Sequence, residues 1–173
     1  MKIEMMEKIT RILTNGNENV VESSNEIIRD IKQFYSNNEE WFSKLLFDED
    51  EIEDAVVSIY AYWLIGYELE AKYQYGVSCD LTSYAEGIVE NLEDVFKNLR
   101  YEVDFSNIEF EDDIDVQDAL VQIDEYMEKE GYRLVALDTD SDSYNLFVAK
   151  SNEYDELLEL GKEAGIVFQS KFN

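Results

Sequence analysis

The apolar residues of the first 100 positions recur mostly at steps of three or four, the spacing that places them on one side of an α-helix. Asn15, Gly16 and Asn17 tolerate positive φ and predict the end of the first helix. The stretch after Asp54 is apolar on nearly every side, which is typical of a buried central helix. We expect helices over residues 1–14, from Ser24 or Asn25 to a break at Asn37 and Asn38, over 41–46, from the acidic run 48–54 to Tyr73 or Tyr75, and over 83–99.

The residues after position 100 add an alternating pattern, which is typical of β-strands. Tyr101–Phe105 alternates apolar and acidic residues and predicts one strand. The polar turn DTDSDS separates two runs of strand-forming residues and predicts an antiparallel hairpin. We expect a helix from Asp115 or Asp118 to Gly131, strands over Tyr132–Leu137 and Tyr144–Ala149, a helix from Ser151 or Asn152 to Gly165, and a third strand over Ile166–Phe168.

These elements predict an α+β fold. Its N-terminal two-thirds is helix-rich, and its C-terminal part runs helix, strand, strand, helix, strand with a small antiparallel sheet. A chain of 173 residues fits one domain over residues 1–173. The change from helical to mixed structure near residue 100 offers the only subdivision, into 1–100 and 101–173.

The N-terminal sequence has no apolar run of the length found in signal peptides. The most apolar stretch, Ala55–Tyr67, is too short to span a bilayer. One unpaired Cys suits a reducing compartment, so we expect a cytoplasmic protein. Many Asn, Ile, Lys and Glu residues without any Pro are typical of an AT-rich bacterial genome.

The chain carries 41 acidic and 14 basic residues, a formal net charge of −27. Nucleic acids and anionic membranes are bound through Lys and Arg, so this charge excludes both as direct partners. There is no His and one Cys, which excludes His-based catalysis, Cys-His and Ser-His-Asp nucleophiles, and zinc sites of His and Cys. Cys79 has no Lys or His beside it and is interpreted as an incidental thiol. We therefore expect a protein that is not an enzyme.

The acidic excess is concentrated in the middle of the chain, where only Lys72, Lys97 and Arg100 are basic between residues 45 and 128. Such a surface is either merely solvated, or a docking face for a basic protein, or a decoy for nucleic acid. If exposed, Tyr60, Tyr62 or Tyr101 would serve as aromatic anchors. The partner-binding candidates are the acids of two blocks: Glu49, Asp50, Glu53, Glu111, Asp112, Asp113 and Asp115.

Asp138, Asp140 and Asp142 form D-x-D-x-D, the spacing of the first three oxygen ligands in a calcium loop. Ser143 stands where that loop needs Gly, and Ala149 stands where it needs a bidentate Glu. The turn is therefore a candidate for weak Ca²⁺ or Mg²⁺ binding, or simply a polar hairpin turn. No other cofactor is expected.

Residues 131–166, with the strand and turn LVALDTDSDSY at 134–144, resemble the C-terminal portion of an uncharacterised bacterial domain-of-unknown-function family. The resemblance implies an α+β fold and no reaction. Acidic single-domain proteins of this size also resemble, as a class and without a shared motif, the immunity proteins of polymorphic toxin systems.

Three functional hypotheses remain open. The leading one is a non-enzymatic inhibitor or immunity protein whose acidic surface covers a basic toxin, nuclease or other nucleic-acid-binding protein. The second is a metal-dependent enzyme or metal-regulated domain that uses the Asp138–Asp142 turn. The third is a housekeeping module whose charge serves only solubility.

Overall fold

The computed structural model describes residues 2–45, 47 and 49–172. Met1, Leu46 and Asp48, which fall in expected helices or in the acidic run, lie outside the described residues. The fold is α+β, as the sequence predicts. Its helices are α1 (Ile3–Leu13), α2 (Glu18–Arg29), α3 (Ile31–Asn37), α4 (Glu39–Leu45), α5 (Val56–Ile65), α6 (Ala85–Leu99), α7 (Val116–Lys129) and α8 (Tyr154–Ala164), with 3-10 turns η1 (Ala71–Tyr73) and η2 (Phe105–Asn107).

The sheet has the strand order β1-β3-β2-β4, and every neighbouring pair is antiparallel. Its strands are β1 (Gly76–Cys79), β2 (Tyr132–Leu137), β3 (Tyr144–Lys150) and β4 (Phe168–Gln169). The predicted hairpin is confirmed, with Tyr132 opposite Lys150 and Leu137 opposite Asn145. The expected third strand of the C-terminal part is β4, which begins at Phe168 and pairs with the end of β2.

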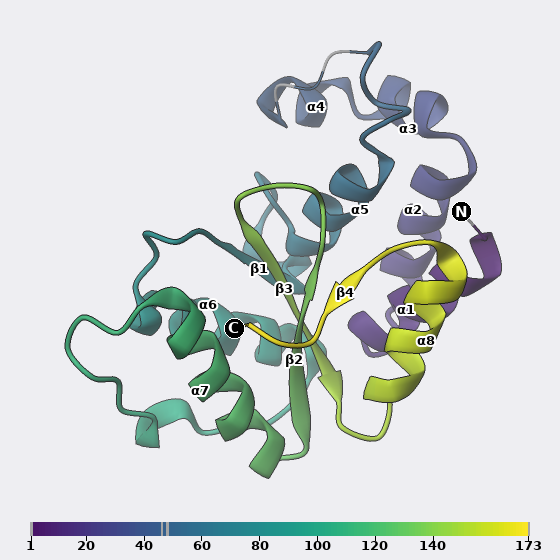
Figure 1. Cartoon of the computed structure of the whole chain (residues 1–173). Coiled ribbons are helices and arrows are strands. Elements are labelled where there is room, and N and C mark those ends of the chain that lie inside the picture. The colour runs from purple at the N-terminus through teal and green to yellow at the C-terminus, as the bar shows by residue number, and fades with distance from the viewer. Residues whose placement is uncertain (1, 46, 48, 173) are drawn as a thin grey trace.

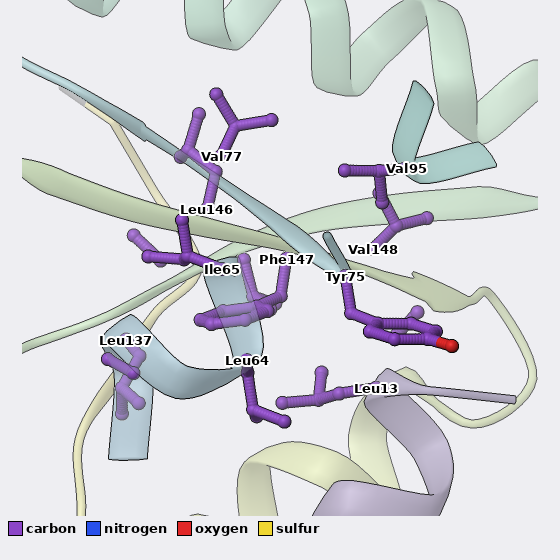
Figure 2. Packing of buried hydrophobic residues seen from close by; sticks show 14 of the residues in the cluster. Leu13, Leu64, Ile65, Tyr75, Val77, Val95, Leu137, Leu146, Phe147 and Val148 are labelled. Carbon is purple, nitrogen blue, oxygen red and sulfur yellow. The ribbon is translucent and has the colours of Figure 1, made fainter. Parts of the chain in front are cut away.

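Helices cover both faces of the sheet (Figure 1), with α6 against β1, α7 against β2, and α1 and α8 against β3. Figure 2 shows Val95 of α6 on one side of the strands with Val77 and Val148, while Leu13 and Leu64 lie on the other side beside Phe147. The central strands are therefore apolar in both directions, and the residues of β3 from Asn145 to Ala149 are all buried. This is why the hairpin reads as two continuous apolar runs in the sequence.

The second helix begins at Glu18 and not at Ser24 or Asn25, so that prediction is wrong. Asn17 caps the helix, because its side chain accepts a hydrogen bond from the backbone N–H of Val20 at 3.5 Å. The segment expected to run unbroken to Asn37 is also divided in two. Asp30 interrupts it with an extended φ of −154°, and its carboxylate caps α3 through the N–H of Gln33.

The central helix α5 is shorter than expected at both ends. Residues 49–54 of the acidic run form turns ahead of the helix instead of its first turn. At the other end, Gly66 adopts a φ of 74° and stops α5 at Ile65, well before the expected end at Tyr73 or Tyr75. The chain then folds back, and the N–H of Tyr75 donates to the carbonyl of Leu64 at 2.9 Å.

Residues 76–79 lie between two of the expected helices, where no strand is expected, and form the edge strand β1. It pairs with β3, with Gly76 opposite Phe147. A Cβ at Gly76 would lie 2.6 Å from the carbonyl oxygen of Leu146, so the close approach of these strands requires glycine.

The strand expected over Tyr101–Phe105 is absent from the described part of the chain. Tyr101 and Phe105 are buried, and both pack on Phe96 of α6, with ring centroids 6.1 and 5.3 Å away. The alternation thus reflects side chains that point into the core from an unpaired segment.

Candidate functional site

A cleft of about 640 Å³ opens at the end of the sheet where β1 ends and the β2–β3 turn begins. Five separate segments meet there: the loop after β1, the first turn of α7, the end of β2, the hairpin turn and β4. The cleft is acidic, and no described residue that lines it is a Lys or Arg. Its lining residues are Asp80, Leu81, Thr82, Gln117, Ala136, Leu137, Asp138, Ser141, Asp142, Ser143, Tyr144 and Gln169.

Asp80 directly follows β1 and is held by its own loop. Its Oδ1 accepts hydrogen bonds from the backbone N–H of Thr82 at 2.8 Å and from the Thr82 hydroxyl at 2.7 Å. These bonds from Thr82, with weaker ones from Ser83, hold the pKa of Asp80 below its usual range. Asp80 is therefore a fixed negative charge at the mouth of the cleft.

Asp138 and Asp142 enter the cleft from the two sides of the hairpin turn. Asp138 Oδ1 accepts from the N–H of Asp140 at 3.0 Å, and its Oδ2 accepts from Gln169 Nε2 at 3.4 Å. Asp140 itself has a φ of 55° and lines a neighbouring hollow with Asp54. Asp142 makes no hydrogen bond or ion pair with the described residues.

The three aspartates of the predicted metal site therefore do not share one hollow: Asp142 lines the cleft, Asp140 lines the neighbouring hollow, and Asp138 lines both. No group of three or more Asp, Glu, Cys or His side chains within residues 2–45, 47 and 49–172 has an arrangement that could hold a metal ion. Weak Ca²⁺ or Mg²⁺ binding at Asp138, Asp140 and Asp142 stays a prediction from their spacing.

The acidic loop Glu111–Asp115 leads directly into the first turn of α7, where Gln117 lines the cleft. Asp115 caps α7 by accepting from the N–H of Asp118 at 2.9 Å, which fixes where the loop ends. Two residues further, Gln117 Nε2 donates to the Tyr144 hydroxyl at 3.0 Å and ties the first turn of α7 to β3. Glu111, Asp112, Asp113 and Asp115 are all exposed.

The second acidic block does not join this site. Glu49, Asp50 and Glu53 are exposed on the turns before α5. Glu53 Oε2 forms an ion pair with Lys32 Nζ of α3 at 3.0 Å, so part of this charge is already neutralised. None of these three residues lines the cleft, whereas Asp54 of the same run lines the neighbouring hollow with Asp138 and Asp140.

The proposed tyrosine anchors are wrong for two of the three residues. Tyr60 is fully buried, and its hydroxyl bonds Thr10 Oγ1 at 2.8 Å. Tyr101 is buried beside Tyr132. Tyr62 is half-buried between Phe47 and Tyr67.

Two exposed apolar residues that the sequence does not single out lie in or after the loop that follows β1. Leu81 is 65% exposed and lines the cleft, and Tyr84 is 82% exposed at the start of α6. Neither residue, nor Asp80, belongs to a recognisable motif, because each depends on the unexpected strand β1. The only local indication of their position is the sequence Asp-x-Thr-Ser at residues 80–83, whose residue types are typical of turns.

Few basic residues pair with the acids of residues 102–128. Arg133 pairs with Asp124 at 2.8 Å and with Glu128 at 3.4 Å. The acids from Glu102 to Asp118 form no ion pair with any described residue. The cleft and the loop Glu111–Asp115 therefore carry uncompensated negative charge.

The profile of one protein family matches nearly the whole chain, over residues 5–171, and its description is "Domain of unknown function (DUF6630)". The chain belongs to the DUF6630 family. Membership in an uncharacterised domain family, which the C-terminal resemblance predicts, is thus confirmed, and the DUF6630 match extends far beyond residues 131–166. No match was found among curated proteins or among solved structures.

No helix in the part of the chain that the structure describes combines the length and apolar character needed to cross a bilayer.

Proposed function

We propose that the protein is a non-enzymatic binding protein that receives Lys and Arg side chains of a basic protein in its acidic cleft. One observation carries the proposal. Asp80 from the loop after β1, and Asp138 and Asp142 from the β2–β3 turn, line one cleft and form no ion pair with any described residue. Unpaired carboxylates on a preformed concave surface attract cations and raise the rate of association with a cationic partner.

The apolar rim favours a protein over a small cation. Leu81 lines the cleft and is largely exposed, and the exposed Tyr84 follows two residues after Thr82, which also lines it. Tyr is enriched at the energetically important positions of interfaces, because it buries a large rigid area and keeps a polar hydroxyl. Lys and Arg can lay their aliphatic stems along such a rim while their charged ends reach the carboxylates.

The charge distribution also favours a specific docking face over charge that serves solubility alone. Solubility requires net charge, but it does not require that charge to be concentrated, and concentrated like charge destabilises the fold through self-repulsion. The loop Glu111–Asp115 adds four exposed acids beside the cleft with no base between Tyr101 and Glu128.

The class of partner follows from charge complementarity. Proteins that bind nucleic acid present basic patches, so a nuclease, toxin or other nucleic-acid-binding protein suits this surface. An inhibitor or immunity protein of this kind in a bacterial cytoplasm is the specific form of the proposal, with Glu111, Asp112, Asp113 and Asp115 at the interface. Glu49, Asp50 and Glu53 would form a secondary contact.

The experiment compares two variants that each lose three negative charges at different places. The loop variant carries Glu111→Gln, Asp112→Asn and Asp113→Asn. The control variant carries Glu156→Gln, Glu159→Gln and Glu163→Gln on the exposed surface of α8. The wild-type protein first captures partners from cell lysate, and the protein that salt elutes is identified by mass spectrometry.

We expect a basic protein whose association with the loop variant is about 3- to 10-fold slower than with the wild type at low salt. The control variant should associate at the wild-type rate, because only the local field steers docking. Equal rates for the two variants, or a captured protein without a basic surface, would contradict the proposal.

A further inference from the structure

Three basic residues gather in a pocket of about 510 Å³ on this otherwise acidic protein. Lys72, Lys97 and Arg100 line it, and they are the only Lys or Arg residues between positions 45 and 128. None of the described residues that line the pocket is acidic, although acids outnumber bases 41 to 14 in the chain. The pocket is therefore positively charged, although the protein as a whole is strongly negative.

The pocket forms where four distant segments meet: the end of α1, the start of α2, η1 and the end of α6. Side-chain amides hold these segments together. Asn15 Nδ2 donates to the carbonyl of Leu99 at 2.9 Å, and Asn17 Nδ2 donates to the Tyr75 hydroxyl at 2.6 Å. Asn98 Nδ2 donates to the carbonyl of Gln74 at 2.8 Å. The pocket is therefore built before any ligand arrives.

The three cations are available to a ligand. The guanidinium of Arg100 makes no ion pair with the described residues. Lys72 pairs with Glu70, and Lys97 with Asp94, each at 2.8 Å on the exposed surface. Exposed pairs of this kind contribute little free energy and exchange readily, so both ammonium groups can turn toward an anion.

The cations are not required to satisfy the helix ends beside them. At the end of α6, the carbonyl of Lys97 accepts from the N–H of Arg100, and the carbonyl of Leu99 accepts from Asn15. At the end of α1, the carbonyl of Arg11 accepts from the N–H of Gly16. The first turn of α2 meets the same pocket at Asn17 and Asn19, and its N-terminal end adds positive potential.

We propose that this pocket binds a small phosphate monoester. The planar fork of Arg100 matches two phosphate oxygens, and the ammonium groups of Lys72 and Lys97 supply the remaining charge. Asn19 and the Tyr75 hydroxyl provide neutral polar contacts suited to the hydroxyl groups of the rest of the ligand. The volume lies in the range of sites for small organic ligands.

The test measures binding of inorganic phosphate and of glucose 6-phosphate to the full chain, with glucose as the uncharged control. Titration calorimetry gives the affinity, and backbone amide NMR shifts at Gly16 and Arg100 locate the site. We expect both phosphates to bind, glucose not to bind, and affinity to fall as salt rises. Arg100→Gln should weaken glucose 6-phosphate binding by about 10- to 100-fold.

Arg29→Gln is the matched control, because Arg29 is an exposed arginine at the opposite end of α2 and makes no ion pair with the described residues. It removes the same charge from the protein and should leave the affinity unchanged. Lys97→Gln provides a second variant if Arg100→Gln lowers the thermal unfolding midpoint. Absence of phosphate binding to the folded wild type, equal affinities of the two arginine variants, or binding of carboxylates such as citrate without phosphate would each overturn the proposal.

Discussion

The hydrogen bond between Thr10 of α1 and Tyr60 of α5 offers a direct test of how the helical half is held together. The two hydroxyls lie 2.8 Å apart, and both residues are at most 1% exposed. Thr10 Oγ1 also donates to the carbonyl of Met6 at 2.9 Å. The Tyr60 hydroxyl therefore donates to Thr10, and Thr10 is its only partner among the described residues. Because the Tyr60 hydroxyl is fully buried, its pKa lies far above the usual value for tyrosine.

Because of this geometry, removal of the Tyr60 hydroxyl and removal of the Thr10 hydroxyl should lower the free energy of unfolding by different amounts. Tyr60→Phe removes one hydroxyl and leaves Thr10 bonded to Met6, so we expect a loss of about 1 kcal/mol in the free energy of unfolding. Thr10→Val keeps the shape but leaves a buried phenol without a partner, so we expect a loss of about 2 kcal/mol. The double variant restores an apolar pair, and its loss should be smaller than the sum of the two by about 1 kcal/mol.

The assay is equilibrium unfolding in urea, followed by the fluorescence of Trp41 and Trp63, with the denaturant slopes compared between variants. Thr14→Val is the matched control, because Thr14 is also a buried threonine of this region and bonds only the carbonyl of Thr10. Its loss should be smaller than that of Thr10→Val and additive with Tyr60→Phe. If Thr10→Val costs no more than Thr14→Val and the Thr10–Tyr60 cycle is additive within about 0.4 kcal/mol, the reasoning is refuted.

Three further outcomes follow from single positions. Gly76→Ala should lower stability by about 1–3 kcal/mol, because its Cβ would lie 2.6 Å from Leu146 O, whereas Gly87→Ala in open space on α6 should raise it in the same urea unfolding assay. Burial raises the pKa of the Cys79 thiol to about 12, so a thiol reagent at pH 8 should label it only in urea; labelling of the folded protein at the rate of free cysteine would contradict this. The lowered pKa of Asp80 stabilises the fold above the unfolded pKa of about 3.9, and this contribution is lost as the pH falls through the lower folded pKa. The stability difference between wild type and Asp80→Asn should therefore be larger at pH 7 than below pH 3, and a difference independent of pH would count against this.

The sequence predicted those elements whose periodicity and end residues are local. The first helix stops near Asn15 because that residue and Gly16 both adopt positive φ, with φ of 48° and 72°. The last helix ends at Gly165 for the same reason, with φ of 80°. The hairpin of β2 and β3 was predictable because each strand contains a continuous apolar run, Leu134–Leu137 and Leu146–Ala149, and the two strands are neighbours in the chain.

The elements that the sequence failed to predict depend on partners far away in the chain. The strand β1 is only four residues long and acquires its structure from pairing with β3, about 70 residues later. Tyr101 and Phe105 alternate like a strand, but their burial comes from Phe96 and not from strand pairing. Gly66 and Gly76 are equally plausible helix ends in the sequence. The helix ends at Gly66 because the chain then folds back, and the N–H of Tyr75 donates a hydrogen bond to the carbonyl of Leu64.

The same division holds for the candidate sites. Charge is additive along the chain, so composition alone led to the prediction that the protein does not bind nucleic acid directly, and the local concentration of acids marked Glu111, Asp112, Asp113 and Asp115 as candidates. Packing alone placed Asp80 beside Asp138, and it alone gathered Lys72, Lys97 and Arg100 into one pocket. The physical reason is the distance along the chain between the residues that determine each feature. Helix periodicity, capping and net charge are set by neighbours a few residues apart, whereas a site requires side chains from distant segments to meet, and only the packed core fixes where those segments lie.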